Sequence, residues 1–213
     1  MKVLGILCSP RKEGNTEILM QEAMTSAREA GAETELFAVR DKDIKPCDAC
    51  YACTKTGKCH IKDDMQELYL KFLEADGIIW GTPVFFFNVT AQAKIIIDRL
   101  YPLYMDGKLV NKVGGVITVA SSLGHSGVLD LFNAIFSANH MFSAGFACGF
   151  ARRRGGIRKD KHAMKAAEEL GRLVVLMLKQ QLRHPKEYDL SIYRFVSRKY
   201  GIDLCPSMGR FEE

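Results

Sequence analysis

Four cysteines lie within thirteen residues of the chain, close enough to hold one inorganic group. Two residues separate the first cysteine from the second and the second from the third, and five residues separate the third from the fourth. Thiolates at the shorter spacing hold the clusters of bacterial ferredoxins. The spacing therefore predicts a [4Fe-4S] cluster with all four ligands on one loop: Cys47, Cys50, Cys53 and Cys59.

Two other interpretations of these cysteines stay open. Structural zinc sites usually pair two short Cys/His motifs across a longer gap, so the overlapping triplet matches zinc less well. Free thiols are the second alternative, because an unligated cysteine also packs as a small hydrophobic residue. The loop can thus bind a cluster, bind zinc or simply bury its sulfurs.

A second group of polar residues follows the first apolar run, residues 3–8, which is typical of a buried parallel strand. A helical pattern begins at Glu17, and the loop before it offers two hydroxyls, a cation, a flexible glycine and an asparagine: Ser9, Thr16, Arg11, Gly14 and Asn15. Because helix N-termini attract anions, this loop predicts a phosphate site, although ordinary capped turns use similar residues. The spacing matches neither the P-loop nor the dinucleotide glycine pattern, which favours a mononucleotide.

Two further loops follow predicted strands at residues 76–81 and 113–120. The first could lay a stiff aromatic segment along a flat heterocycle, although core packing also explains each single phenylalanine. Its candidates are Thr82, Pro83, Val84, Phe85, Phe86, Phe87 and Asn88. The second loop offers the small residues Ser121, Ser122 and Gly124. His125 beside them could bond a ring carbonyl or lie solvated.

Apolar runs alternate with helical patterns throughout the chain. Strands are also expected at residues 33–39 and 142–151, and helices at residues 17–30, 89–99 and 160–183. Another helix should run from the 121–127 loop to about residue 141. A further helix should begin at Asp64, which would form a reciprocal cap with Glu67. This order predicts an α/β fold with a doubly wound, five-stranded parallel sheet and helices on both faces. Ligands of such sheets bind beyond the strand carboxyl ends, so the loops after strands one, three and four should form one site.

Composition indicates one globular domain. Hydrophobic residues make up 47% of the 213 positions, and the net charge of +5 does not demand a nucleic acid partner. No apolar run approaches the roughly 18 residues of a membrane span, so no membrane partner is expected. The first apolar run is too short for a signal peptide, and a cysteine-rich loop fits a reducing compartment, which favours the cytoplasm.

Two other features complete the sequence. The basic cluster Arg152, Arg153, Arg154, Arg158, Lys159 and Lys161 could receive an acidic redox partner or a pyridine-nucleotide phosphate, and a solvated loop explains it equally. Cys148 is expected in the core. The weakly patterned tail, with a possible helix at residues 190–200 and with Cys205, has no assigned task.

Several of these motifs occur together in one known family. The loop residues after strands one and three, with Ala91-Gln92-Ala93-Lys94 and Asp98-Arg99 beyond them, resemble the NAD(P)H-dependent FMN reductase branch of flavodoxin-like proteins. The four cysteines resemble the ligand motif of the iron–sulfur flavoproteins of methanogenic and other anaerobic microbes. The resemblance covers roughly residues 1–183.

The resemblance implies a flavodoxin-like fold with two cofactors. FMN would bind with its phosphate in the 9–16 loop and its ring against residues 83–88 and 121–124, and a [4Fe-4S] cluster would occupy the cysteines. Such proteins are homodimers or homotetramers in which flavin and cluster meet near subunit interfaces. They take electrons from ferredoxin and pass them to acceptors that include dioxygen and peroxide.

These observations predict a redox flavoprotein. Residues 1–183 would form an FMN-binding domain with a cysteine-loop insertion at 42–60, followed by a C-terminal extension at 184–213. The cofactors would carry the chemistry, so no acid/base pair or catalytic triad is required, and none is evident in the sequence. The alternatives are a cluster-free NAD(P)H-dependent FMN or quinone reductase, and a zinc-stabilised binding module.

Overall fold

Five parallel strands form one sheet in the computed structural model, which describes residues 1–201. The order is β2-β1-β3-β4-β5, and each neighbouring pair is parallel. The strands are β1 (Lys2–Leu7), β2 (Glu33–Ala38), β3 (Gly77–Pro83), β4 (Val113–Ala120) and β5 (Phe142–Phe150). The three central strands are almost wholly buried, as parallel strands covered on both faces should be. The predicted sheet is confirmed.

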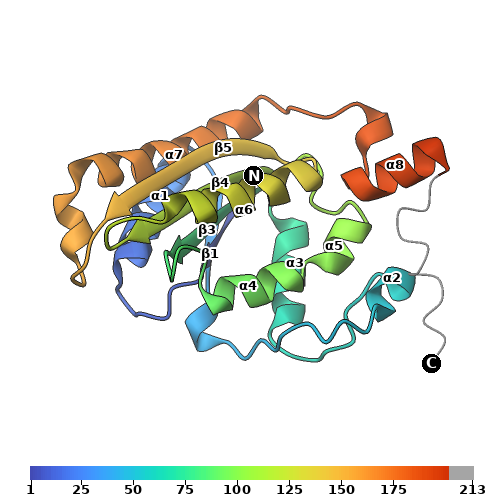
Figure 1. Cartoon of the computed structure of the whole chain (residues 1–213). Coiled ribbons are helices and arrows are strands. Elements are labelled where there is room, and N and C mark those ends of the chain that lie inside the picture. Colours follow the sequence, from blue (N-terminus) through green and yellow to red (C-terminus); the bar gives the residue numbers. More distant parts are fainter. Residues whose placement is uncertain (202–213) are drawn as a thin grey trace.

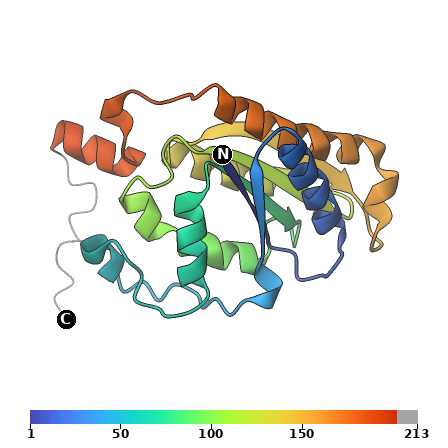
Figure 2. The ribbon, with the colours of Figure 1, turned by 180° about the vertical axis from the view of Figure 1, so that it is seen from behind.

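Helices cover both faces of the sheet (Figures 1 and 2). One layer contains α1 (Asn15–Glu29) and α7 (Lys161–Lys179), and the other contains α3 (Met65–Glu74), α4 (Ala91–Asp98) and α6 (His125–Ala138). A Cβ at Gly171 would lie 1.9 Å from the carbonyl oxygen of Ala23, so this glycine lets α7 approach α1 closely. Each layer buries its own hydrophobic cluster against the sheet.

The remaining elements are short. They are α2 (Ala52–Thr56) within the cysteine loop, α5 (Tyr101–Met105) after α4, α8 (Ile192–Tyr200) near the end, and three 3-10 turns at Val39–Asp41, Gly156–Lys159 and Lys186–Tyr188. Among residues 1–201, no helix combines the length and the apolar character that crossing a membrane requires.

The predicted reciprocal cap at the start of α3 is wrong. The carboxylate of Asp64 accepts a hydrogen bond from the N–H of Asp43 at 2.8 Å, and Glu67 pairs with Lys42 at 2.7 Å. Asp63 accepts instead from the N–H of Met65 at 3.1 Å. Contacts with residues distant in the sequence therefore replaced the local arrangement.

The segment after α7 packs against the edge of the sheet where β5 begins. The imidazole of His184 stacks on Phe142 at 4.6 Å, and His140 Nδ1 lies 2.7 Å from the carbonyl oxygen of Leu190. Cys148, expected in the core, is only half-buried on edge strand β5, where burial raises the pKa of its thiol to about 11. Cys205 lies outside the described residues.

Candidate functional site

A cavity of about 170 Å³ lies beyond the carboxyl ends of the central strands. It sits beside β1 and β3, where the strand order reverses and where ligands of such sheets bind. Nine of the residues selected from the sequence line it: Ser9, Arg11, Gly14, Asn15, Thr16, Pro83, Val84, Phe85 and Ser121. The fold thus brings the three predicted loops together around one cavity.

The β1–α1 loop wraps tightly around its end of this cavity. Ser9 Oγ accepts a hydrogen bond from the N–H of Arg11 at 3.3 Å, and a Cβ at Gly14 would lie 3.2 Å from Cβ of Arg11. The acidic residue in the first turn of α1, Glu17, is neutralised by a two-pronged pair with Arg40 at 3.0 and 3.2 Å. The positive end of the helix dipole is therefore left for an anion.

Asn15 both lines the cavity and ties it to the β5–α7 loop. Its Nδ2 donates to the carbonyl oxygen of Arg153 at 2.9 Å, and its Oδ1 accepts from the N–H of Ile157 at 3.4 Å. This connection places Arg152 on the cavity wall. Sequence reasoning placed Arg152 in a basic cluster for a redox partner or a pyridine-nucleotide phosphate and did not assign it to the flavin site, although its position close after a strand was a usable signal.

The β3–α4 loop forms a tight hairpin with aromatic residues at its tip. Phe85 and Asn88 exchange backbone hydrogen bonds of 2.9 and 3.1 Å. Phe86 and Phe87 between them have φ values of 43° and 70°, and the Phe86 side chain is 96% exposed. Left-handed backbone costs about 1–2 kcal/mol for each non-glycine residue, and such strain clusters at functional sites.

The hairpin is held in place by the β4–α6 loop and the first turn of α6. A Cβ at Gly127 would lie 2.3 Å from the carbonyl oxygen of Phe87, and Gly124, at φ 103°, packs against Val84. His125 does not line the cavity: its Nε2 lies 3.1 Å from the carbonyl oxygen of Gly149, and its ring meets Phe150 edge-on.

Six other residues selected from the sequence do not line the cavity: Thr82, Phe86, Phe87, Asn88, Ser122 and Gly124. Thr82 is completely buried, and its hydroxyl donates to the carbonyl oxygen of Pro83 while accepting from the N–H of Thr90. The hydroxyl of Thr90 in turn caps α4 and donates to the carbonyl oxygen of Cys8 at 2.9 Å. Thr82 thus supports the loop rather than the cavity wall.

A second cavity, of about 420 Å³, lies between the cysteine loop and the end of α4. All four cysteines of the motif contribute to its wall, together with aromatic side chains and an arginine: Tyr51, Tyr69, Tyr101 and Arg99. The fold therefore brings the four predicted ligands around one space.

The base of the cysteine loop is fixed by a buried ion pair. The guanidinium of Arg99 donates to both carboxylate oxygens of Asp63 at 2.9 and 3.1 Å, and both side chains are 1% exposed. Arg99 also donates to the carbonyl oxygen of Lys45 at 2.8 Å, and Asp63 accepts from the N–H of the same residue at 2.9 Å. Residues before and after the loop are thus joined to the core.

The tip of the loop is more exposed and is strained. Ala49 and Tyr51 have left-handed φ values of 57° and 53° on either side of Cys50. Burial raises the pKa of the Cys53 thiol, and the three other cysteines of the loop raise it further. Hydrogen bonds from Cys50 and His60 lower the pKa of the Asp48 carboxyl. Four thiolates held this closely repel one another, and a bound cationic centre would remove that repulsion.

Helix α4 separates the two cavities. Val84 and Phe85 of the first cavity precede it, whereas Asp98 and Arg99 of the second lie at its end. A helix of eight residues is about 12 Å long, so the residues at the two ends of α4 lie about that far apart within one chain.

Comparisons with known proteins agree with this arrangement. A family model described as NADPH-dependent FMN reductase matches residues 1–151. An iron–sulfur flavoprotein from Methanocaldococcus jannaschii is 38% identical over 189 residues, which cover 84% of this chain and 98% of that protein.

Two solved structures share the fold. RosB with bound 8-demethyl-8-formylriboflavin-5′-phosphate superposes with a TM-score of 0.69 at 21% identity, covering 84% of this chain and 81% of RosB. A flavodoxin from the Archaea superposes with a TM-score of 0.56 at 13% identity, covering 84% of this chain and 99% of the flavodoxin. At these identities the structures support the flavodoxin-like fold alone. Because the family model matches most of the chain and a relative matches at 38% identity, the chain belongs to the iron–sulfur flavoproteins of the NADPH-dependent FMN reductase family.

Proposed function

We propose that this protein is an electron-transfer flavoprotein that binds FMN in the cavity beside β1 and β3 and a [4Fe-4S] cluster on Cys47, Cys50, Cys53 and Cys59. The observation that carries the proposal is the convergence of four cysteines on one cavity, in a chain whose other cavity occupies the ligand position of a doubly wound sheet. The name of the relative, an iron–sulfur flavoprotein, supports both cofactors.

The first cavity fits a flavin mononucleotide. Backbone N–H groups at the start of α1, with Arg11 and Arg152, would hold the phosphate, and Pro83 to Phe85 would lie against the ring. FMN would supply the capacity to store one or two electrons. Glu17 stays paired with Arg40, so no unpaired carboxylate of the first turn opposes the phosphate.

The second cavity fits a cluster ligated by thiolates. Its four sulfurs come from a loop whose base is already fixed by Arg99 and Asp63, and all four cysteines line the same cavity. The cluster would transfer one electron at a time. No protein acid or base is assigned to the reaction, and the residues serve to hold the two cofactors.

We also propose that the protein works as a homodimer or homotetramer. Within one chain the eight residues of α4, about 12 Å of helix, lie between the loop at the first cavity and the residues that reach the second. Association of protomers would bring the cluster of one chain nearer to the flavin of another. The neighbouring exposed side chains of Phe85, Phe86 and Phe87 at the hairpin support such an interface, because grouped exposed apolar side chains mark interaction sites.

The proposed electron donor is a ferredoxin-like protein or NAD(P)H, and the proposed acceptors include dioxygen and peroxide. We place the protein in the cytoplasm, because the loop cysteines are free thiols and a reducing compartment would keep them so. The proposed organisation is an FMN-binding domain at residues 1–183, with the cysteine loop at 42–60 and an extension at 184–213.

Cofactor analysis of the full chain, purified without oxygen, tests the proposal. We expect about four irons, four acid-labile sulfides and one FMN per chain. FMN without iron or sulfide, even after anaerobic reconstitution, would overturn the cluster and leave an NAD(P)H-dependent FMN or quinone reductase. Colourless protein with stoichiometric zinc would instead indicate a zinc-stabilised binding module.

A further inference from the structure

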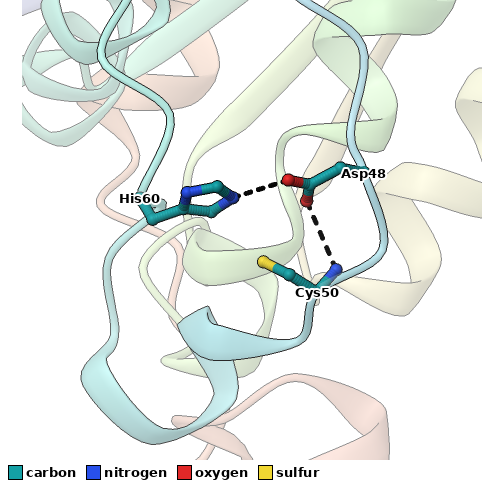
Figure 3. Close-up of side chains that lie close together, drawn as sticks. All are labelled: Asp48, Cys50 and His60. Atoms are coloured by element: carbon teal, nitrogen blue, oxygen red, sulfur yellow. Dashed lines mark hydrogen bonds and ion pairs between the residues drawn. The ribbon is translucent and has the colours of Figure 1, made fainter.

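Three side chains at the tip of the cysteine loop converge on one point, and two of them lie outside the four-cysteine motif. The sulfur of Cys50, a carboxylate oxygen of Asp48 and a ring nitrogen of His60 all lie within 4.8 Å of one another (Figure 3). All three residues are exposed, so ions can reach them from solvent. A [4Fe-4S] cluster on the cysteines needs neither Asp48 nor His60.

The backbone of the loop builds this group. Asp48 Oδ1 accepts a hydrogen bond from the N–H of Cys50 at 3.3 Å, which orients the carboxylate (Figure 3). Its other oxygen, Oδ2, lies 2.7 Å from Nε2 of His60, twelve residues along the chain. Left-handed conformations at Ala49 and Tyr51 turn the chain sharply on both sides of Cys50. The three ligand atoms are therefore grouped by the fold of the loop.

The donor set identifies the class of cation. A thiolate, an imidazole and a carboxylate together match the preference of zinc, whereas magnesium and calcium prefer oxygen ligands alone. Three protein ligands also leave one tetrahedral position open for water.

We propose that Asp48, Cys50 and His60 bind one zinc ion when the loop holds no cluster. Because the zinc site and the four-cysteine site share the sulfur of Cys50, occupancy of one excludes occupancy of the other. The zinc site stands on its own geometry, and only the exclusion rests on the proposed function. The loop thus has two alternative metal states, one with zinc and one with the cluster. Asp48 and His60 stabilise only the zinc state.

Zinc titration of the reduced, cluster-free full chain, in competition with a colorimetric zinc chelator, tests the site. We expect one zinc per chain, and more than about tenfold weaker binding in Asp48→Asn, His60→Ala and Cys50→Ala. Cys47→Ala and the surface control His162→Ala should bind zinc as the wild type does. Circular dichroism verifies that each variant is folded.

The opposite pattern would overturn the zinc site. If Cys47→Ala and Cys53→Ala weaken zinc binding as much as Cys50→Ala, while Asp48→Asn and His60→Ala do not, the ion is held by cysteines alone. Absence of zinc binding by the folded wild type would have the same consequence.

Reconstitution after zinc loading tests the exclusion. Iron and sulfide should build the visible cluster absorption more slowly in zinc-loaded wild type than in zinc-treated His60→Ala. Equal rates in the two proteins would overturn the exclusion. If neither protein, with or without zinc, takes up iron, the proposed cluster function fails while the zinc titration still decides the zinc site.

Discussion

The two cavities are built in different ways. The cavity beside β1 and β3 is walled by short loops that leave the strands of the sheet and lead toward helices, and hydroxyls such as those of Thr82 and Thr90 fix the loops from within the core. The cysteine cavity is walled on one side by a long exposed loop, whose base is fixed by the buried ion pair and whose Tyr51 ring meets Tyr101 edge-on. The first site depends on the whole fold, whereas the tip of the second can change without disturbing the rest.

The largest expected effect comes from the base of the cysteine loop. Arg99→Met leaves the buried carboxylate of Asp63 without its partner, which should lower the free energy of unfolding by about 3–5 kcal/mol. Urea denaturation measures this loss. The matched control is Lys94→Met, which removes an exposed pair with Asp98 and should cost less than about 1 kcal/mol. Equal small losses would show that the base is not part of the core.

The same pair sets a dependence on pH. Burial opposes ionisation of Asp63, but its hydrogen bonds with Arg99 hold the pKa of the carboxyl below the ordinary value of 3.8. Because the folded pKa is the lower one, this stabilisation is complete above the ordinary value and is lost as the pH falls through the folded pKa. Acid titration of the unfolding free energy should show this loss in the wild type. In Asp63→Asn the curve should lack it.

A smaller effect is expected where the aromatic hairpin meets α6. In Gly127→Ala the new Cβ would collide with the carbonyl oxygen of Phe87, so the hairpin must move, at a cost of about 1–3 kcal/mol. FMN titration should show weaker binding, while iron content stays at the wild-type level. Gly156→Ala is the control, because its Cβ would meet only an ordinary contact at 3.7 Å. Loss of iron in Gly127→Ala would contradict the independence of the two sites.

The smallest effect on stability is expected at the exposed tip. In cluster-free protein, Cys50→Ala should change the free energy of unfolding by less than about 0.5 kcal/mol, as exposed positions usually do. Iron and sulfide should nevertheless be lost while FMN is retained. Parallel measurement of iron, FMN and urea denaturation checks all three. A full iron complement in Cys50→Ala would refute the ligand assignment.

Local sequence patterns predicted the sheet well, because its strands are short apolar runs with little ambiguity. β4 occupies residues 113–120 as expected, and the site loops follow from the order of the strands. The cap at Asp64 was predicted wrongly because its carboxylate bonds to Asp43, a contact made across the cysteine loop. The pair between Arg99 and Asp63 joins residues 36 apart, and no local pattern announces it.

The predicted site was incomplete for a related reason. Arg152 follows strand β5 closely, but which residues of that loop face the cavity depends on the tertiary bond between the side chain of Asn15 and the carbonyl oxygen of Arg153. Thr82 stands in the predicted loop, but its hydroxyl serves Thr90. Position after a strand identifies the loop, and the direction of each side chain is decided by packing.

The closed base of the cysteine loop determines the order in which the protein can mature. Small zinc domains fold only when their metal arrives, because nothing else holds their ligands together. Here Arg99 and Asp63 join the two ends of the loop through protein contacts alone. The chain can therefore fold and take up its flavin first, and iron delivery becomes a later step on a finished scaffold. Iron starvation would then yield a folded stock of protein that regains its cluster when iron returns, without new synthesis.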